Sequence, residues 1–199
     1  MFNAGEIAKI KTSTLDILSK PERSISVNFQ VGQKIFSGYR VQWSNKLGPY
    51  KGGIRYHPRA DEEEVSTLAF IMIIKNAVVN IPFGGGKGGI SFDPQKHTLK
   101  EVEKITRAFT RSIAQNIGPH IDIPAPDVNT NSQIIDWIAD EYEKITGDKT
   151  KAVVTGKSIE NNGSLGRISA TGWGGREVLL HAYKKYLDKP TNEVTVAIQ

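Results

Sequence analysis

Apolar residues recur every three or four positions in five segments of the chain, which is the spacing of one buried helix face. Capping signals mark where three of these segments begin: Asp61 with Glu64, Thr98 with Glu101, and Asn131 before a third. The pattern predicts helices over residues 4–18, 61–79, 98–117, 132–145 and 171–186.

Other segments alternate apolar and polar residues, as strands with one buried face do. Residues 23–30 and 34–43 alternate on either side of "VGQ" and predict an antiparallel hairpin. Residues 120–127, "HIDIPAPD", predict a short strand that ends in prolines, and residues 193–199 predict a buried strand. Strands alternating with helices indicate an α/β fold, here a mixed, largely parallel sheet flanked by helices.

Stretches rich in glycine, proline or small polar residues separate these elements and predict loops over 44–58, 81–94 and 146–166. Residues 155–175 are especially rich in Gly, Ser and Asn, which indicates a hinge between two domains.

Composition narrows the class of protein. The chain has 199 residues, of which 38% are hydrophobic and 24% charged, as in a folded globular protein. The longest apolar run, "LAFIMII" at 68–74, is too short to cross a bilayer, and the N-terminal residues lack the apolar core of a signal peptide. Cysteine is absent, so there is no disulfide framework. We expect a cytoplasmic protein without membrane contact.

The net charge of +5 raises the question of nucleic-acid binding. Lysines and arginines are interleaved with acids, as in "KEVEKITRAFTR" at 100–111. This mixture is typical of a solvated helix face, so we expect no nucleic-acid partner.

The stretch "IPFGGGKGGISFDP" presents one lysine, Lys87, among glycines. A phosphate-binding P-loop needs glycine six positions before the lysine and a hydroxyl residue after it, whereas Ile81 and Gly88 stand there. The glycines instead let a ligand approach the backbone closely. Lys51 and Lys75 are candidate neighbouring cations, although Lys75 also suits the edge of an apolar helix face. Together the three lysines indicate a site for an anion with more than one carboxylate.

Proton transfer at such a site needs an acid or base. Asp122 falls on the predicted strand and is expected to be structural, whereas Asp127 follows two prolines that fix its backbone direction. A helix cap is the alternative role for Asp127. The four histidines have no partner at metal-ligand spacing, so no metal site is predicted.

The motifs taken together resemble the Glu/Leu/Phe/Val dehydrogenases, and among them the hexameric glutamate dehydrogenases of archaea and bacteria. The resemblance rests on "GPYKGGIRYHP", "GGGKGG", "DIPAPDVNTN", "TGKSIENNGSLGRISATGWG" and "TVAIQ", in that order, from about residue 22 to residue 199. The run "SIENNGS" departs from the "GGS" usual in the family.

The resemblance implies two catalytic side chains: Lys87, which polarises the 2-oxo group and activates water, and Asp127, which transfers protons. Lys75 and Arg167 would hold the α-carboxylate of the substrate and Lys51 its distal carboxylate, beside Gly52 and Gly53. Thr171 would touch the nicotinamide.

Lys51 indicates the substrate within the family. The resemblance implies that the branched-chain and phenylalanine members have an apolar residue at this position. An ammonium suits a second carboxylate and is costly against an aliphatic side chain. The resemblance thus implies oxidative deamination of L-glutamate with NAD or NADP, in a homo-oligomer, expected to be a hexamer. The alternative is a catalytically silent module that serves in assembly.

The resemblance also implies two domains, with substrate binding and oligomerisation over residues 1–165. Residues 166–199 would begin a Rossmann-like cofactor domain, whose G-x-G-x-x-G fingerprint is expected directly after "TVAIQ". Since that fingerprint is absent, we expect a truncated cofactor domain, weak dinucleotide binding and little turnover by the 199-residue chain itself.

Overall fold

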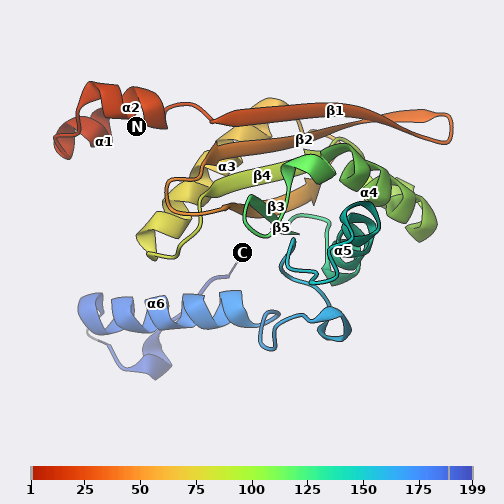
Figure 1. Cartoon of the computed structure of the whole chain (residues 1–199). Helices are drawn as coiled ribbons and strands as arrows, with labels where there is room; N and C mark the ends of the chain where they lie inside the picture. The colour runs from red at the N-terminus through yellow and green to blue at the C-terminus, as the bar shows by residue number, and fades with distance from the viewer. Residues whose placement is uncertain (1, 188, 199) are drawn as a thin grey trace. The chain divides into compact units, whose positions relative to one another are not determined.

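A computed structural model describes residues 2–187 and 189–198 of the chain (Figure 1). The chain divides into two compact units, Met1–Gly163 and Ser164–Gln199. No helix in the described ranges is both long and apolar enough to cross a membrane.

The first unit is built on a five-stranded sheet with the order β1-β2-β4-β3-β5. Its strands are β1 (Arg23–Val31), β2 (Lys34–Ser44), β3 (Tyr50–Tyr56), β4 (Gly85–Ile90) and β5 (Asp122–Pro126). β2 is antiparallel to both β1 and β4, while β3 is parallel to β4 and β5. Four strands therefore run one way and β2 runs against them, which confirms the mixed, largely parallel sheet.

The hairpin of β1 and β2 has the register expected from its alternation, with Val31 opposite Lys34. Gly32 makes the turn with φ 61°, a left-handed conformation that glycine adopts without strain.

The predictions of loops over residues 44–58 and 81–94 are wrong in part, because each of these glycine-containing segments includes a strand of the sheet. β4 has the sequence "GGKGGI", and every residue in it is buried. Glycine does not favour strands in isolation, so the pattern along the chain gave no signal. Packing decides instead: a Cβ at Gly85 would lie 2.6 Å from the carbonyl oxygen of Ala69 in α3 (Glu62–Val78).

Helices α3, α4 (Leu99–Ile113) and α5 (Ser132–Thr146) confirm the predicted positions and caps. Asp61 accepts a hydrogen bond from the Glu64 amide, and Asn131 accepts one from the Ile134 amide. At α4, Thr98 and Glu101 form the complete reciprocal capping box. Short 3-10 turns follow or connect these elements at Pro94–Lys96, Ala114–Asn116 and Ile159–Asn161.

The single helix predicted over residues 4–18 is wrong. The chain forms two helices, α1 (Phe2–Ile7) and α2 (Thr12–Leu18), interrupted at Lys9 with φ 53°. The break lets α2 return onto α1, where a Cβ at Gly5 would lie 2.4 Å from the Leu15 side chain. A straight helix could not bring these two residues together.

Helices cover both faces of the sheet. α3 packs on β2 and β4 around Val41, Trp43, Val65 and Ala69. The larger core lies on the other face of the sheet. There α4 and α5 pack on the strands and bury aromatic and aliphatic side chains, among them Phe109, which lies beside Gly38 of β2.

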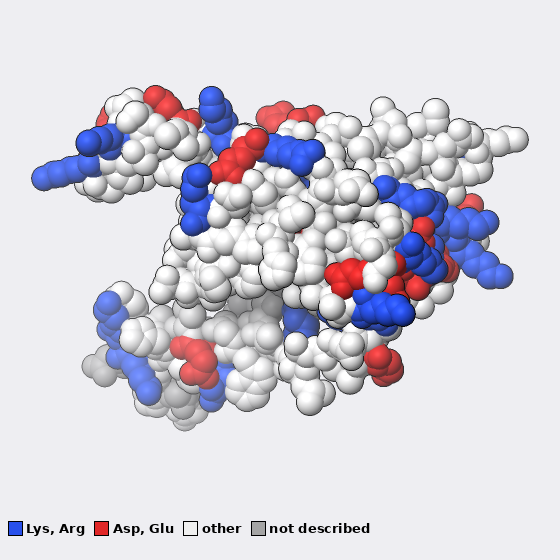
Figure 2. All heavy atoms as spheres, viewed as in Figure 1, with Lys and Arg blue, Asp and Glu red and all other residues white. Residues whose placement is uncertain are grey.

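Charged residues bind α4 to α5 on their outer side. Arg107 bridges Glu103 on its own helix and both Asp140 and Glu141 on α5. Basic and acidic side chains accordingly alternate over these helices on the face shown in Figure 2.

The second unit holds α6 (Ala170–Tyr186) and a 3-10 turn at Thr191–Glu193. The strand predicted over residues 193–199 is wrong as far as it is described, because residues 194–198 have no strand structure; Gln199 lies outside the described residues. A strand needs a neighbour for its N–H and C=O groups, and the described part of this unit offers no other strand.

A buried ion pair links β2 to the edge strand β5 across the sheet. Arg40 of β2 donates from Nε to Asp122 Oδ2 of β5 at 2.8 Å and from Nη2 to Asp122 Oδ1. Both side chains are fully buried, and Arg40 also donates to the Gly52 carbonyl at 3.2 Å. The Arg40 side chain crosses β4 at Gly86. A Cβ at Gly86 would lie 3.3 Å from Arg40 Nη2 and 3.3 Å from Asp122 Oδ1. This agrees with the structural role expected of Asp122.

Replacing Asp122 by Asn would leave the Arg40 charge buried without its counter-charge. We expect Asp122→Asn to lower the free energy of unfolding by about 3–5 kcal/mol. Urea denaturation followed by circular dichroism measures this. The control is Lys144→Gln, which removes an exposed pair with Asp140 and should cost less than about 1 kcal/mol. Equal small losses in both variants would contradict a supporting role for the Arg40–Asp122 pair.

Candidate active site

Strand periodicity brings the predicted side chains to one face of the sheet. Lys51, Gly53 and Arg55 alternate along β3 and share a face, since successive strand residues point to opposite sides. In the parallel pairing of β3 with β4, Ile54 lies beside Gly88. Gly53 and Lys87 each come one residue earlier, so they point to the same face. This is the face that α3 covers, because Gly85 and Gly89 of β4 lie against α3 residues.

Lys87 and Asp127 meet directly at this face. Lys87 Nζ donates to Asp127 Oδ1 at 2.9 Å, and Arg55 Nε donates to Asp127 Oδ2 at 2.9 Å. Arg55 Nη1 donates in turn to Glu64 Oε1 of α3 at 2.7 Å. The side chain of Lys87 is only 6% exposed, whereas that of Asp127 is 21% exposed and reaches toward solvent.

This arrangement shifts the ionisation of both partners. Burial is the main cause that lowers the pKa of Lys87 below its ordinary value, and the charges of Arg55 and Arg40 lower it further against the opposing effect of Asp127. Burial alone would raise the pKa of Asp127, but the hydrogen bonds and charges of Lys87 and Arg55 outweigh it and lower that pKa. A carboxylate that stays ionised beside an acidified ammonium is suited to proton transfer.

The backbone of Asp127 is held independently of its carboxylate. Its N–H donates to the Thr130 hydroxyl at 2.7 Å, and that hydroxyl donates to the Ile54 carbonyl at 2.9 Å. The alternative role of Asp127 as a helix cap is wrong, because Asn131 caps α5. The Asp127 side chain is therefore committed to Lys87 and Arg55.

Gly52 and Gly53 are both buried, and each permits a close approach of the backbone. A Cβ at Gly52 would lie 1.5 Å from the Gly86 carbonyl oxygen, and one at Gly53 would lie 2.6 Å from Asp127 Cβ. Glycine at position 53 thus sets where Asp127 can sit. Contact of either glycine with substrate stays a prediction.

Lys51 is half-buried on β3. Its Nζ donates to the Thr155 hydroxyl at 2.7 Å and to the Ile123 carbonyl at 3.2 Å. The loop after α5 therefore helps to hold this ammonium in place.

Lys75 lies in the last turn of α3 with its side chain exposed. It stands one turn beyond Met72, whose Cγ would lie 3.2 Å from a Cβ at Gly52. Among the described residues Lys75 has no hydrogen bond or ion pair through its side chain, so its ammonium is available for an anion.

Arg167 and Thr171 belong to the second compact unit and are exposed there. Their predicted roles in binding the α-carboxylate and the nicotinamide stay predictions. In the unusual run before them, Asn162 adopts a left-handed conformation with φ 64°, which asparagine tolerates better than most residues.

Sequence reasoning missed Arg55 and Glu64. Arg55 follows Lys51 at strand spacing, so the signal was present in "YKGGIRY" but hidden by the interpretation of that segment as a loop. Glu64 was assigned only to the helix cap, and nothing local indicates that its carboxylate contacts β3.

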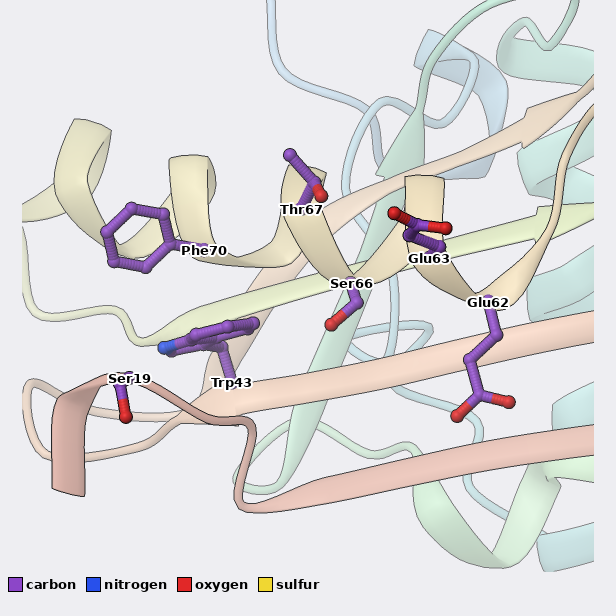
Figure 3. Close-up of a pocket in the computed structure, with 7 residues that line it drawn as sticks. All are labelled: Ser19, Trp43, Glu62, Glu63, Ser66, Thr67 and Phe70. Carbon is purple, nitrogen blue, oxygen red and sulfur yellow. The ribbon is translucent and has the colours of Figure 1, made fainter. Parts of the chain in front are cut away.

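A hollow of about 500 Å³ on another part of α3 does not coincide with these residues (Figure 3). It lies between the end of α2, Trp43 of β2 and the outer side of α3, where Trp43 faces Phe70 at 5.2 Å between ring centroids. Two acidic residues line it, Glu62 and Glu63, and Glu62 accepts hydrogen bonds from Ser24 and Ser26 of β1. No basic side chain of the described part of the chain lines the hollow to pair with a carboxylate substrate. Within the described residues, no three His, Asp or Glu side chains gather as metal ligands would.

Comparison with known proteins identifies the family of this chain. The family model for the Glu/Leu/Phe/Val dehydrogenase dimerisation domain matches residues 21–144. The NADP-specific glutamate dehydrogenase A1 of Halobacterium salinarum is 43% identical over 206 residues, covering 99% of this chain and 48% of that protein.

Two crystal structures are similar in fold. The glutamate dehydrogenase of Peptoniphilus asaccharolyticus superimposes with a TM-score of 0.88 at 39% identity, over 92% of this chain and 48% of that one. The hetero-hexameric glutamate dehydrogenase of Thermus thermophilus, in its Leu-bound form, gives 0.86 at 37% identity, over 89% and 44%.

The chain spans about half the length of the relatives it matches. The family model covers well over half of the chain, including the strands that carry Lys51 and Lys87 and the segment after β5 that carries Asp127. On this evidence the chain belongs to the Glu/Leu/Phe/Val dehydrogenase family.

Proposed function

We propose that this chain supplies the substrate site of an enzyme that oxidatively deaminates L-glutamate. One L-glutamate, one water and one oxidised NAD or NADP would yield 2-oxoglutarate, ammonium, the reduced cofactor and a proton. The observation that carries the proposal is the Lys87–Asp127 contact at 2.9 Å, on the sheet face that also bears Lys51. Family membership supports it.

Lys87 would stabilise the negative oxygen that develops when water adds to the substrate imine. Its ammonium is nearly buried, and a charge acts more strongly on a reacting atom where water is excluded. Because burial lowers the pKa of Lys87, the group could also release a proton more readily than an exposed lysine.

Asp127 would carry protons to and from the substrate nitrogen. Its pKa is lowered by Lys87 and Arg55, which favours the ionised form that accepts a proton. Its partial exposure leaves a route by which that proton can exchange with solvent.

Lys51 and Lys75 would fix the two ends of the substrate, at the distal carboxylate and the α-carboxylate respectively. We assign the selection of glutamate to Lys51, since an ammonium suits a second carboxylate and would be costly against an aliphatic side chain. Holding both ends orients Cα for reaction.

NAD or NADP would accept the hydride from the substrate when bound. On this chain, Thr171 at the start of α6 is the group we assign to it, and its exposed hydroxyl makes no hydrogen bond within the described residues. We assign residues 1–165 to substrate binding and oligomerisation, and residues 166–199 to the start of the cofactor domain.

The proposal also includes a homo-oligomer, expected to be a hexamer. The matching family model is that of a dimerisation domain, and the Thermus thermophilus relative is a hexamer, there of unlike subunits.

The substrate is tested with the protein expressed from the whole gene in which this chain occurs. Oxidation of NADH and NADPH with ammonium should be faster with 2-oxoglutarate than with 4-methyl-2-oxopentanoate. Lys51→Leu should lower kcat/KM for 2-oxoglutarate by about 10- to 100-fold, because a charged hydrogen bond to the distal carboxylate is lost. Lys46→Leu, at an exposed lysine of the preceding loop, is the matched control.

Preference of the parent protein for the branched acid would contradict the role of Lys51. Activity with neither acid would contradict the enzymatic proposal and favour a silent assembly module.

The position of Asp127 is tested at Gly53. A Cβ there would collide with Asp127 Cβ and with the Pro126 carbonyl oxygen at 2.8 Å. Gly53→Ala should therefore lower kcat by roughly 100-fold, as a small misplacement of a reacting group does. Gly175→Ala in α6, where a Cβ meets nothing within 4 Å, should leave the fold intact. Full activity of Gly53→Ala would show that Asp127 is not held by this contact.

The oligomeric state is tested by size-exclusion chromatography with light scattering. We expect six subunits for the product of the whole gene and at least a dimer for the 199-residue chain. A 199-residue chain that stays monomeric at micromolar concentration would contradict the assignment of oligomerisation to residues 1–165.

A further inference from the structure

Four side chains of alternating charge form one connected row beside the sheet: Glu64, Arg55, Asp127 and Lys87. The links are 2.7 Å from Arg55 to Glu64, 2.9 Å from Arg55 to Asp127 and 2.9 Å from Lys87 to Asp127. They come from α3, β3, the segment after β5, and β4. Of the four, Glu64 and Arg55 have no part assigned to them in the proposed reaction.

Glu64 gives up a local interaction to take its place in this row. At the start of α4, Glu101 bonds back to the Thr98 N–H and completes the capping box. At the start of α3, Glu64 has the same position relative to Asp61, but its carboxylate bonds Arg55 instead. Its second oxygen, Oε2, is buried and has no hydrogen-bond partner within the described residues. The helix keeps its Asp61 cap but forgoes the reciprocal Glu64 bond, which indicates that the Arg55 contact has another purpose.

The guanidinium of Arg55 acts as a rigid bridge between the two carboxylates. Its Nε donates a hydrogen bond to Asp127 Oδ2 and its Nη1 donates one to Glu64 Oε1. The planar guanidinium is therefore fixed at both ends. With Oδ2 occupied, the Asp127 carboxylate cannot rotate freely, and Oδ1 is left to Lys87. The carboxylate is thus held in the orientation that the reaction needs.

We propose that Arg55 is a positioning residue for Asp127: anchored by Glu64, it holds one carboxylate oxygen so that the other faces Lys87 and the reacting nitrogen. This inference rests on the proposed function and adds to it a residue that touches neither substrate nor cofactor.

The charges around Asp127 make the effect measurable. Lys87 of β4 and Arg55 of β3 face the carboxylate directly, Glu64 of α3 faces Arg55, and Arg40 of β2 acts on Lys87. Arg55 lowers the pKa of Asp127 through its hydrogen bond, and its charge also lowers the pKa of Lys87. Removing Arg55 should therefore raise both pKa values. The acidic limb of a pH–rate profile then moves to higher pH whichever of the two groups it reports.

The first experiment compares Arg55→Met, Arg55→Lys and Arg59→Met in the product of the whole gene. Arg59 is exposed in the following loop and controls for the loss of one positive charge. For Arg55→Met we expect kcat to fall roughly 10- to 100-fold with little change in KM, and the acidic limb of kcat/KM to rise by about one pH unit. Arg55→Lys should recover the pH profile more than kcat, because it restores charge but not the planar fork.

A second experiment does not depend on activity. The side-chain carboxyl carbon of Asp127 is titrated by NMR in the 199-residue chain, for the parent, Arg55→Met and Arg59→Met. We expect an upward pKa shift of about one unit in Arg55→Met alone.

The outcomes separate the two proposals. A parent protein inactive with 2-oxoglutarate would contradict the proposed function, whatever the titration gives. An active parent with an unchanged pH profile and unchanged Asp127 titration in folded Arg55→Met would overturn the role of Arg55. A loss of kcat in Arg55→Met with no shift in either measurement would reduce Arg55 to general structural support and would also overturn it.

Discussion

The close approach of other groups to strand β4 is the constraint on which the rest of this structure depends. On one face, a Cβ at Gly85 would enter the backbone of α3. On the other, Cβ atoms at Gly86 and Gly88 would stand in the path of the buried Arg40 side chain. Lys87 is the long side chain that remains between these glycines, and it points to the face on which α3 lies. The glycines therefore bring a helix and an ion pair close to β4 and leave one ammonium at its centre.

The two faces of the sheet divide the work between them. On one face Arg40 reaches across β4 to Asp122 and to the Gly52 carbonyl, which ties β2, β3 and β5 together without exposing charge. The opposite face carries the nearly buried Lys87 and also Asp127, whose partial exposure leaves it open to a ligand. A buried ion pair of this kind adds little stability over an apolar core, but here it links β2 to β5 across the strands that lie between them. The positions of Lys87 and Asp127 depend on the same order of strands.

The pKa of Lys87 is set by its burial and by a small number of charged neighbours. Burial makes the charged ammonium costly, and Asp127 offsets part of this cost. Arg55 and Glu64 add one charge of each sign nearby, so the row carries no net formal charge. Burial thus lowers the pKa of Lys87, while the hydrogen bonds from Lys87 and Arg55 lower the pKa of Asp127.

Sequence alone determined the family resemblance, helices α3, α4 and α5 with their caps, and the hairpin, and it singled out Lys87 and Asp127, which the structure places in contact. These depend on short-range patterns: Thr98 with Glu101, the turn at Gly32, and the proline-flanked Asp127 are all readable within a few residues. Tertiary structure decided that "GGKGGI" is a central strand, that the N-terminal helix breaks at Lys9, and that Arg55 and Glu64 join Asp127. A run of glycines shows no alternation of apolar and polar residues. A carboxylate in the first turn of a helix can bond the N-cap backbone or an arginine of another element, and the local sequence does not distinguish the two. Only the packing of α3 on the sheet brings Glu64 to Arg55, because α3 lies against Gly85 and Gly89 of β4, a strand that follows both residues in the chain.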